Sequence, residues 1–170
     1  MRVAAEAGLR WTIARQRSDG SWPYGERPYL NWVDNFHTGY VLDSLMFCLD
    51  AELDVDGEMA LERGLAYYRS ALFLEDGTPK YLPDSVYPID AQCVAQAIKT
   101  MALAGARDPA YGTFAWTVFD FARRRMQRRD GSYLFQRRRR WVNAAPHIRW
   151  MAAPMLEALA RLQRTAEAEA

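Results

Sequence analysis

The chain has 170 residues, half of them hydrophobic and 13% aromatic, which is enough for one domain with a packed core and short for two. Its 22 basic and 21 acidic residues leave a net charge of +1, so global charge gives no argument for nucleic-acid binding. No apolar run approaches the roughly 20 residues of a membrane span, and charged residues interrupt the N-terminal segment, so we expect no signal peptide. Two cysteines cannot make a disulfide framework, and we expect a cytoplasmic protein.

Hydrophobic residues recur with the helical period along the whole chain. This pattern predicts six helices, over residues 3–17, 36–51, 58–74, 89–104, 109–127 and 148–165. The first helix is expected to turn Val3, Ala7, Leu9 and Ile13 inward. The fourth carries Lys99 as its one basic residue within 91–104, which predicts burial on nearly all sides. We expect a single domain over residues 1–165, followed by a frayed tail at 166–170.

Internal repetition organises the chain. Asp-Gly pairs begin at residues 19, 76 and 130, in steps of 57 and 54 residues. The segment from Gln16 to Trp22 recurs closely from Gln127 to Tyr133. The glycine is expected to end the preceding helix by supplying a positive φ. The unit is therefore a helix, an Asp-Gly turn, a long loop rich in aromatic residues, and a second helix.

Repeated helix pairs of this length predict an all-α fold, an incomplete (α/α) toroid of three antiparallel helical hairpins. The first helix of each pair would lie outside and the second inside, with the long aromatic loops at one end. A short α-solenoid is the alternative, because it also stacks helix pairs side by side.

The motif Q-x-x-D-G-S-W at residues 16–22 resembles the repeat motif of the α/α-toroid superfamily that includes terpenoid cyclases and protein prenyltransferase β subunits. In triterpene cyclases that motif is a structural clasp between repeats. The runs at residues 20–25, 32–40, 76–81 and 87–92 resemble bacterial toroid proteins associated with polysaccharide biosynthesis genes. The resemblance covers about residues 10–159. It implies the C-terminal half of a longer toroid, or a chain that pairs with another copy.

The acidic groups that define other members of that superfamily are absent. The nearest match to a cyclase acid cluster, Asp54-Val55-Asp56-Gly57, is interpreted as a helix cap and turn. An EF-hand over the same segment fails because its twelfth position is Arg63. A zinc site from His37, His147, Asp90 and Cys93 is the metal alternative, but Cys93 and Cys48 fit small apolar fillers of inner helices better. We expect no metal and no cofactor.

Polar residues gather where the long loops enter the inner helices. We expect Asp34, His37, Asp90 and His147 to be catalytic, with the two aspartates flanking a substrate as in glycosidases and a histidine moving a proton. The expected substrate-binding residues are Trp22, Tyr24, Trp32, Asn35, Tyr40, Tyr87, Gln92, Trp141, Asn143, Arg149 and Trp150. The alternative is structural: Asp34 or Asn35 and Asp90 would cap helices, and the aromatic residues would cover one end of the barrel.

Flat aromatic rings beside carboxylates, amides and Arg are typical of sugar sites. Nine arginines between residues 123 and 140 form either a solvated face or an anion-binding rim, and residues 137–140 favour a uronate or a phosphorylated sugar. The sequence thus predicts a polysaccharide-associated toroid that binds or processes an acidic glycan or lipid-linked sugar. A non-catalytic scaffold and an isoprenoid-handling cyclase-like protein are the alternatives, and nucleic acid is not an expected partner.

Three helix pairs leave both ends of the arc uncovered. Apolar residues are expected to be exposed there: Trp11 and Ile13 at one end, and Trp150, Met151, Met155 and Leu159 at the other. Because exposed apolar patches usually mark interfaces, we expect a homodimer or pairing with an N-terminal half.

Overall fold

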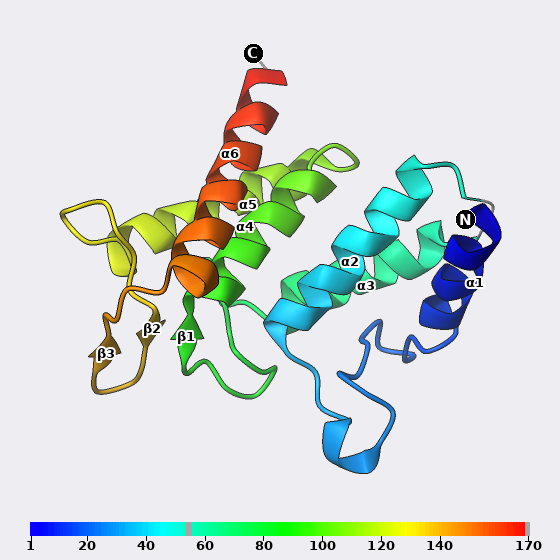
Figure 1. Ribbon diagram of the computed structural model, residues 1–170, viewed down its shortest axis with the longest axis horizontal. Coiled ribbons are helices and arrows are strands. Elements are labelled where there is room, and N and C mark those ends of the chain that lie inside the picture. The colour runs from blue at the N-terminus through cyan, green and yellow to red at the C-terminus, as the bar shows by residue number, and fades with distance from the viewer. Residues whose placement is uncertain (54–55, 169–170) are drawn as a thin grey trace.

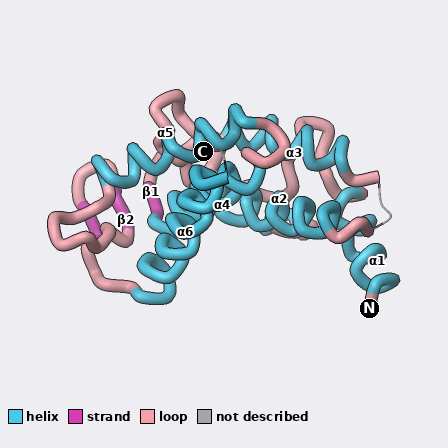
Figure 2. Tube along the Cα trace, turned by 90° about the horizontal axis from the view of Figure 1, so that it is seen from above, coloured by secondary structure: helices cyan, strands magenta, loops and turns pink. Residues whose placement is uncertain are grey.

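The computed structural model describes residues 1–53 and 56–168. Within these residues the chain forms six α-helices: α1 (Arg2–Ile13), α2 (Asn35–Asp50), α3 (Glu58–Ala71), α4 (Ala91–Ala104), α5 (Pro109–Arg125) and α6 (Ala153–Ala168). Helices α2, α4 and α6 form the inner row of a curved arc, and α3 and α5 form its outer row (Figure 2). The predicted three antiparallel hairpins, with outer first helices and inner second helices, are confirmed for the second and third units.

Aspartates start three of the helices. The side chains of Asp34, Asp90 and Asp108 each accept a hydrogen bond from a backbone N–H two or three residues later. Such a bond satisfies one of the free donors of the first helical turn, and Pro109 follows at a position that needs no N–H. The capping role predicted for Asp34 and Asp90 is therefore confirmed.

Helix α1 differs most from its prediction. It ends at Ile13 instead of residue 17. Of the four residues expected to face inward, only Leu9 is buried, while Val3 is 79% exposed. The physical reason is that α1 lies at the edge of the arc (Figure 1), where no inner helix packs against the rest of its surface.

The glycines of the three repeated Asp-Gly turns, Gly20, Gly77 and Gly131, have φ angles of 91°, 83° and 86°, positive as predicted. Their predicted role as helix ends is wrong, because α1, α3 and α5 stop several residues earlier. Each glycine N–H instead bonds the carbonyl three residues before it, as Gly77 does with Leu74. The N–H of that earlier residue bonds the carbonyl just after the glycine. This pattern is a tight hairpin turn with a glycine bulge.

The long loops lie together at one end of the helices (Figure 1) and carry a small antiparallel sheet in the order β1-β2-β3. Its strands are β1 (Ile89–Asp90), β2 (Gln136–Arg137) and β3 (Val142–Asn143). Residues 89–90, predicted as the start of a helix, are a strand because they pair with the third loop. The predicted start of the sixth helix is a π-helical turn over Ile148–Ala152, which precedes α6.

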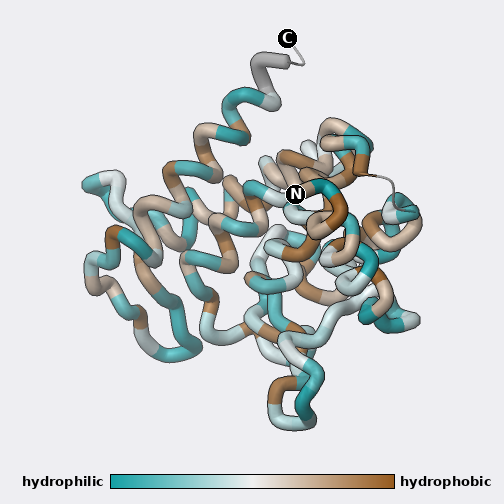
Figure 3. Tube along the Cα trace, turned by 45° about the vertical axis from the view of Figure 1, so that its right-hand side comes forward, coloured by the Kyte–Doolittle hydropathy of each residue, from teal (hydrophilic) through white to brown (hydrophobic). Residues whose placement is uncertain are grey.

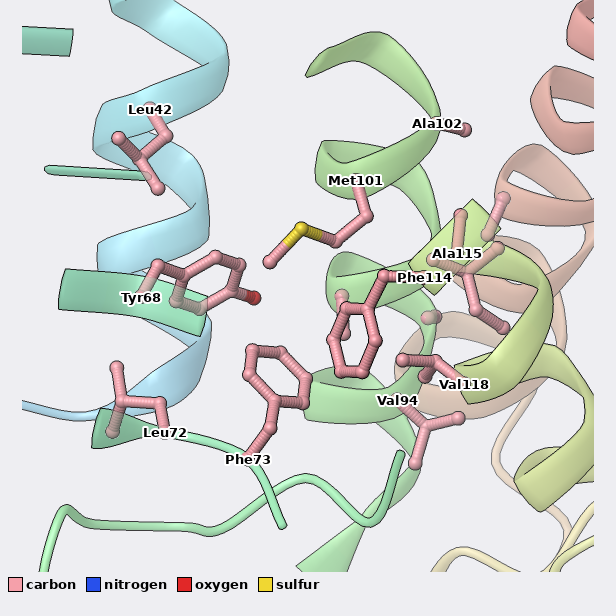
Figure 4. Packing of buried hydrophobic residues seen from close by; sticks show 14 of the residues in the cluster. Leu42, Tyr68, Leu72, Phe73, Val94, Met101, Ala102, Phe114, Ala115 and Val118 are labelled. Carbon is pink, nitrogen blue, oxygen red and sulfur yellow. The ribbon is translucent and has the colours of Figure 1, made fainter. Parts of the chain in front are cut away.

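The core fills the space between the two rows. Hydrophobic and hydrophilic residues alternate along the helices (Figure 3), and the hydrophobic ones meet around α4. Tyr68, Phe73 and Phe114 lie edge to face there, with centroids 5.0 and 5.2 Å apart (Figure 4). The exposure predicted for Met151 and Met155 is wrong: they are 5% and 1% exposed, because the π-helical turn and α6 both pack against α4.

None of the helices in the described part of the chain is both long and apolar enough to cross a bilayer.

Candidate active site

Two adjoining cavities lie along the inner helices at the loop end, with volumes of about 390 and 180 Å³. They share the side chains of Phe36, Gln92 and Trp150. We call the pair the inner groove. The groove is thus built where α2 and α4 begin and where the π-helical turn leads into α6.

Asp34 and His37 form a carboxylate–imidazole pair on the first turn of α2. One carboxylate oxygen of Asp34 accepts the backbone N–H of His37 at 2.8 Å, and the other lies 2.8 Å from its ring Nδ1. Asp34 is buried, whereas the His37 side chain is 48% exposed. A carboxylate beside Nδ1 favours the tautomer with a proton on that nitrogen, which leaves Nε2 as a free base.

Aromatic rings surround this imidazole. Tyr24 and Trp32 stack face to face with centroids 4.2 Å apart. The edge-on contact between Tyr24 and His37 has a centroid distance of 4.7 Å. Phe36 approaches the same imidazole at 5.2 Å. These contacts hold the ring orientation that the Asp34 hydrogen bond selects.

Asp90 is the second carboxyl group of the smaller cavity. One of its oxygens caps α4, and the other accepts the amide of Gln136 at 2.7 Å. The β1–β2 pairing sets Gln136 directly opposite Asp90. Desolvation by burial raises the pKa of Asp90, while the Gln136 hydrogen bond opposes that rise. The group therefore holds a proton to higher pH than an exposed aspartate does.

A buried polar cluster borders the larger cavity. Asp43 of α2 accepts hydrogen bonds from Thr100 at 2.6 Å and Gln96 at 2.8 Å. Lys99 lies 3.2 Å from Asp43 and 3.7 Å from Glu157 of α6. Burial raises the pKa of Asp43, against the lowering effect of Thr100 and Lys99. The cluster fixes a cation on the wall of the groove and ties the three inner helices together.

A second hollow of about 400 Å³ lies on the second and third loops. Its lining consists of Tyr87, Pro88, Arg138, Arg139, Arg140 and Trp141. The guanidinium of Arg138 lies 5.0 Å from the centroid of the Trp141 ring. We call it the arginine hollow, and it combines cationic groups with exposed flat rings.

The structure brings together a subset of the residues that the sequence singled out. The inner groove is lined by Trp32, Asp34, His37, Tyr40, Asp90, Gln92, Arg149 and Trp150, with Tyr24 stacked behind Trp32. Tyr87 and Trp141 line the arginine hollow instead.

Four predicted residues lie elsewhere. Trp22 is buried and donates its indole N–H to the carbonyl of Thr12. Asn35 is buried between the hydroxyl of Tyr68 and the carbonyl of Leu72. Asn143 accepts the N–H of Ala145, and His147 packs against Phe135. Their described contacts are structural.

Sequence reasoning missed several residues that line the groove or support its side chains. No sequence pattern pointed to Gln136, because its contact with Asp90 spans 46 residues. Lys99 could have been found from the sequence, since it is a lone basic residue in a helix that is otherwise almost uncharged. Tyr81, Phe36 and Glu157 also line the groove.

The alternative of a zinc site has no support in the described residues, because no three His, Cys, Asp or Glu side chains are grouped there to hold an ion. Burial raises the pKa of the Cys93 thiol well above its usual value, which disfavours a thiolate ligand. Asp54 and Val55, from the acidic run considered above, lie outside the described residues.

No protein-family model and no curated protein sequence matches the chain. Among solved structures, it is similar to cellobiose 2-epimerase from Spirochaeta thermophila DSM 6192, with a TM-score of 0.76, 18% identity, and coverage of 98% of this chain and 49% of that one. It is also similar to an unsaturated glucuronyl hydrolase specific for heparin, with a TM-score of 0.70, 15% identity, and coverage of 94% and 49%. The chain spans about half the length of both proteins. At these identities the likeness establishes the fold, which is that of an α/α toroid.

Proposed function

We propose that the inner groove binds a saccharide and changes it by general acid–base chemistry. The observation that carries this proposal is a pair of opposed groups in one cavity: an imidazole held by Asp34, and the carboxyl group of Asp90 with its raised pKa. A basic ring nitrogen and a carboxyl group that keeps its proton to higher pH are suited to act as base and acid in one site.

His37 supplies the base in this scheme. Its Nε2 accepts a proton from the substrate, and the Asp34 carboxylate stabilises the resulting imidazolium through the 2.8 Å contact with Nδ1. Asp90, protonated to higher pH because it is desolvated, donates a proton to a substrate oxygen. The same two steps serve proton abstraction beside a carbonyl or the activation of water.

Aromatic rings and amide groups support a sugar over other ligands. Trp32 and Trp150 line the cavity that contains Asp34 and Asp90, and Gln92 lies beside them. Rings of this kind stack on the apolar faces of sugars, while amides and carboxylates bond the hydroxyls. The two solved proteins of similar fold are an epimerase of cellobiose and a glucuronyl hydrolase, which agrees with this substrate class.

An acidic glycan is the substrate that the charges favour. Arg149 and Lys99 line the larger cavity together with Glu157, which lies 3.7 Å from Lys99, so Arg149 is the cation offered to a substrate there. The arginine hollow adds three cationic side chains on the neighbouring loops. A guanidinium binds a carboxylate or phosphate in a two-point fork. The charged and amide groups of the groove disfavour an isoprenoid chain, because such a chain would leave them without partners.

The test is to offer the protein neutral disaccharides and matched disaccharides with a terminal uronate. Tryptophan fluorescence measures binding, and proton NMR in deuterated water detects epimerisation, hydrolysis or deuterium uptake. We expect the uronate sugars to bind more tightly and to be turned over. Replacement His37→Gln should abolish turnover while binding persists.

His147→Gln is the matched control, because His147 packs against Phe135 outside the groove and should leave turnover unchanged. Saccharide binding without turnover in the unmodified protein would favour the non-catalytic alternative over the acid–base scheme. A protein that binds none of the sugars would contradict the proposal as a whole.

A further inference from the structure

The first two Asp-Gly turns pack against the outer helix that follows them. A methyl group on Gly20 would lie 2.4 Å from the carbonyl oxygen of Arg63 on α3, and one on Gly77 would lie 2.8 Å from that of Thr117 on α5. Arg63 stands fourteen residues before Gly77, and Thr117 stands fourteen before Gly131. The contact therefore recurs at the same position of the repeated unit.

The third turn has no such neighbour among the described residues. A methyl group on Gly131 would meet no atom within 4 Å. In the first unit the amide of Gln16 donates to the carbonyls of Gly20 and, on α3, Ala60, at 3.1 and 2.8 Å. The side-chain amide of its counterpart, Gln127, donates to the carbonyl of Gly131 at 3.3 Å.

Tyr133 takes the place of Trp22 in the third unit. Trp22 packs against α3, where a methyl group on Gly64 would lie 2.6 Å from its ring. The Tyr133 ring is buried, and within the described part of the chain its hydroxyl has no hydrogen-bond partner. The third unit thus has the same turn that packs on an outer helix in the first two units, but within the described residues no outer helix lies against it.

Helix α6 likewise has no outer helix after it in the described residues. The first two inner helices pack against the outer helix that follows them, α2 against α3 and α4 against α5. Leu42 of α2 and Ile98 of α4 lie at matching places, eight residues after Asp34 and Asp90, and Leu156 lies on α6. Leu42 and Ile98 are 0% exposed, whereas Leu156 is 71% exposed. On α3, a methyl group at Gly64 would lie 2.8 Å from Leu42.

Helix α1 has a complementary uncovered face, because it is the first helix of its pair and no inner helix precedes it in the described residues. Ala7 stands thirteen residues before Gly20, as Gly64 does before Gly77. Both are small residues, and Ala7 is exposed. Val3 occupies the position of Ala60 and is 79% exposed.

We propose that two copies of this chain associate head to tail into a closed ring, with α1 of each copy seated on the third Asp-Gly turn and α6 of the other. Ala7 of one copy then lies against Leu156 and Tyr133 of the other, as Gly64 lies against Leu42 and Trp22. The carbonyl of Val3 offers Gln127 the acceptor that Ala60 offers Gln16.

Two copies are the number that the comparisons favour. The chain spans 49% of each of the two solved proteins of similar fold, so two copies supply the length of one. A head-to-tail contact either closes or grows into a filament, and a two-fold axis closes it with both open edges covered. This inference does not depend on the proposed saccharide chemistry.

The test uses sedimentation velocity and light scattering at tens of micromolar. We expect a particle of twice 19.5 kDa. Leu156→Glu and Ala7→Arg each place a charge on one open edge, and each should weaken association roughly tenfold or more, because a charge would be buried without a partner. Met59→Glu is the matched control, since Met59 is 61% exposed on α3, a helix that takes no part in the proposed contact.

Mixing the two edge variants makes the test specific for the ring. A mixed dimer has one unaltered contact and one in which the new arginine meets the new glutamate, so the mixture should re-form dimers that neither variant forms alone. Circular dichroism checks that each variant is folded. A monomer for the unmodified chain, dimers that survive both edge changes, a larger assembly, or a mixture that stays monomeric would each overturn the proposal.

Discussion

Asp34 and Asp90 occupy the same place in two successive units and differ in what their second oxygen contacts. Each uses one oxygen to cap an inner helix. The other oxygen of Asp34 holds the imidazole of His37, whereas that of Asp90 accepts the amide of Gln136. The repeat thus conserves the backbone role and leaves the second oxygen free to take a different partner in each unit.

This difference separates the chemistry of two otherwise similar groups. The half-exposed imidazole of His37 gives Asp34 a partner that can carry a proton on either ring nitrogen. A neutral amide gives Asp90 hydrogen-bonding support but no charge to offset its burial, and its pKa rises. One carboxylate can therefore cap a helix with one oxygen and support acid–base chemistry with the other. The structural and the catalytic interpretation of these aspartates do not exclude each other.

The largest expected effect comes from Asp34→Asn. The new side chain keeps a capping oxygen, but its NH₂ group cannot accept a hydrogen bond from the Nδ1–H of His37 and so favours the wrong tautomer. We expect turnover of the saccharide to fall about 1,000-fold, within the range for loss of acid–base function. Steady-state kinetics measures the loss, and an unchanged melting temperature shows that the cap survives. Full activity in this variant would show that Asp34 acts only as a helix cap.

Removing both oxygens tests what the two aspartates share. Asp34→Ala and Asp90→Ala should each lower the free energy of unfolding by about 1 kcal/mol, the usual cost of a lost N-cap. Urea denaturation measures the loss. The matched control is Asp108→Ala, which removes the cap of α5 away from the groove and should cost about the same. A clearly smaller loss at Asp34 than at Asp108 would contradict the equivalence of the caps.

Gln136→Ala removes the hydrogen bond to the second oxygen of Asp90 and leaves the helix cap in place. Because the Gln136 hydrogen bond lowers the pKa of Asp90, its removal should raise that pKa further and extend activity to higher pH. The maximal rate should change by only a few fold, about 1 kcal/mol for one hydrogen bond. A pH–rate profile checks the shift. Movement of the alkaline limb to lower pH would show that Asp90 is not the acid.

The smallest effect concerns stability against pH. The folded pKa of Asp90 lies above its ordinary value of 3.8, so the native state binds the proton more tightly than the unfolded chain. The stabilisation is complete below pH 3.8 and is lost as the pH rises through the folded pKa. Asp90→Asn should remove that decline, as followed by urea denaturation across the acidic range. An identical decline in the variant would assign the effect to another group, of which Asp43 is the next candidate.

The features that the sequence predicted correctly are local. Helical periodicity, aspartate caps and the positive φ of Gly20, Gly77 and Gly131 each depend on residues a few positions apart. The sequence also placed Asp34, His37 and Asp90 at loop ends that enter the inner helices. It misjudged the turns because a glycine with positive φ serves a helix end and a hairpin bulge equally well.

Tertiary structure decided whatever depends on a partner distant in the sequence. The β1–β2 pairing brought Gln136 to Asp90. The packing of the π-helical turn and α6 on α4 buried Met151 and Met155, which the repeat pattern had left exposed. The same packing left Leu156 uncovered. The amino-acid sequence by itself determined the helices, their caps and the repeated unit, because short-range hydrogen bonds and periodicity specify them. Burial, and with it the pKa of Asp90 and the open faces of α1 and α6, was decided only when the units stacked, because solvent exclusion is a property of the assembled arc.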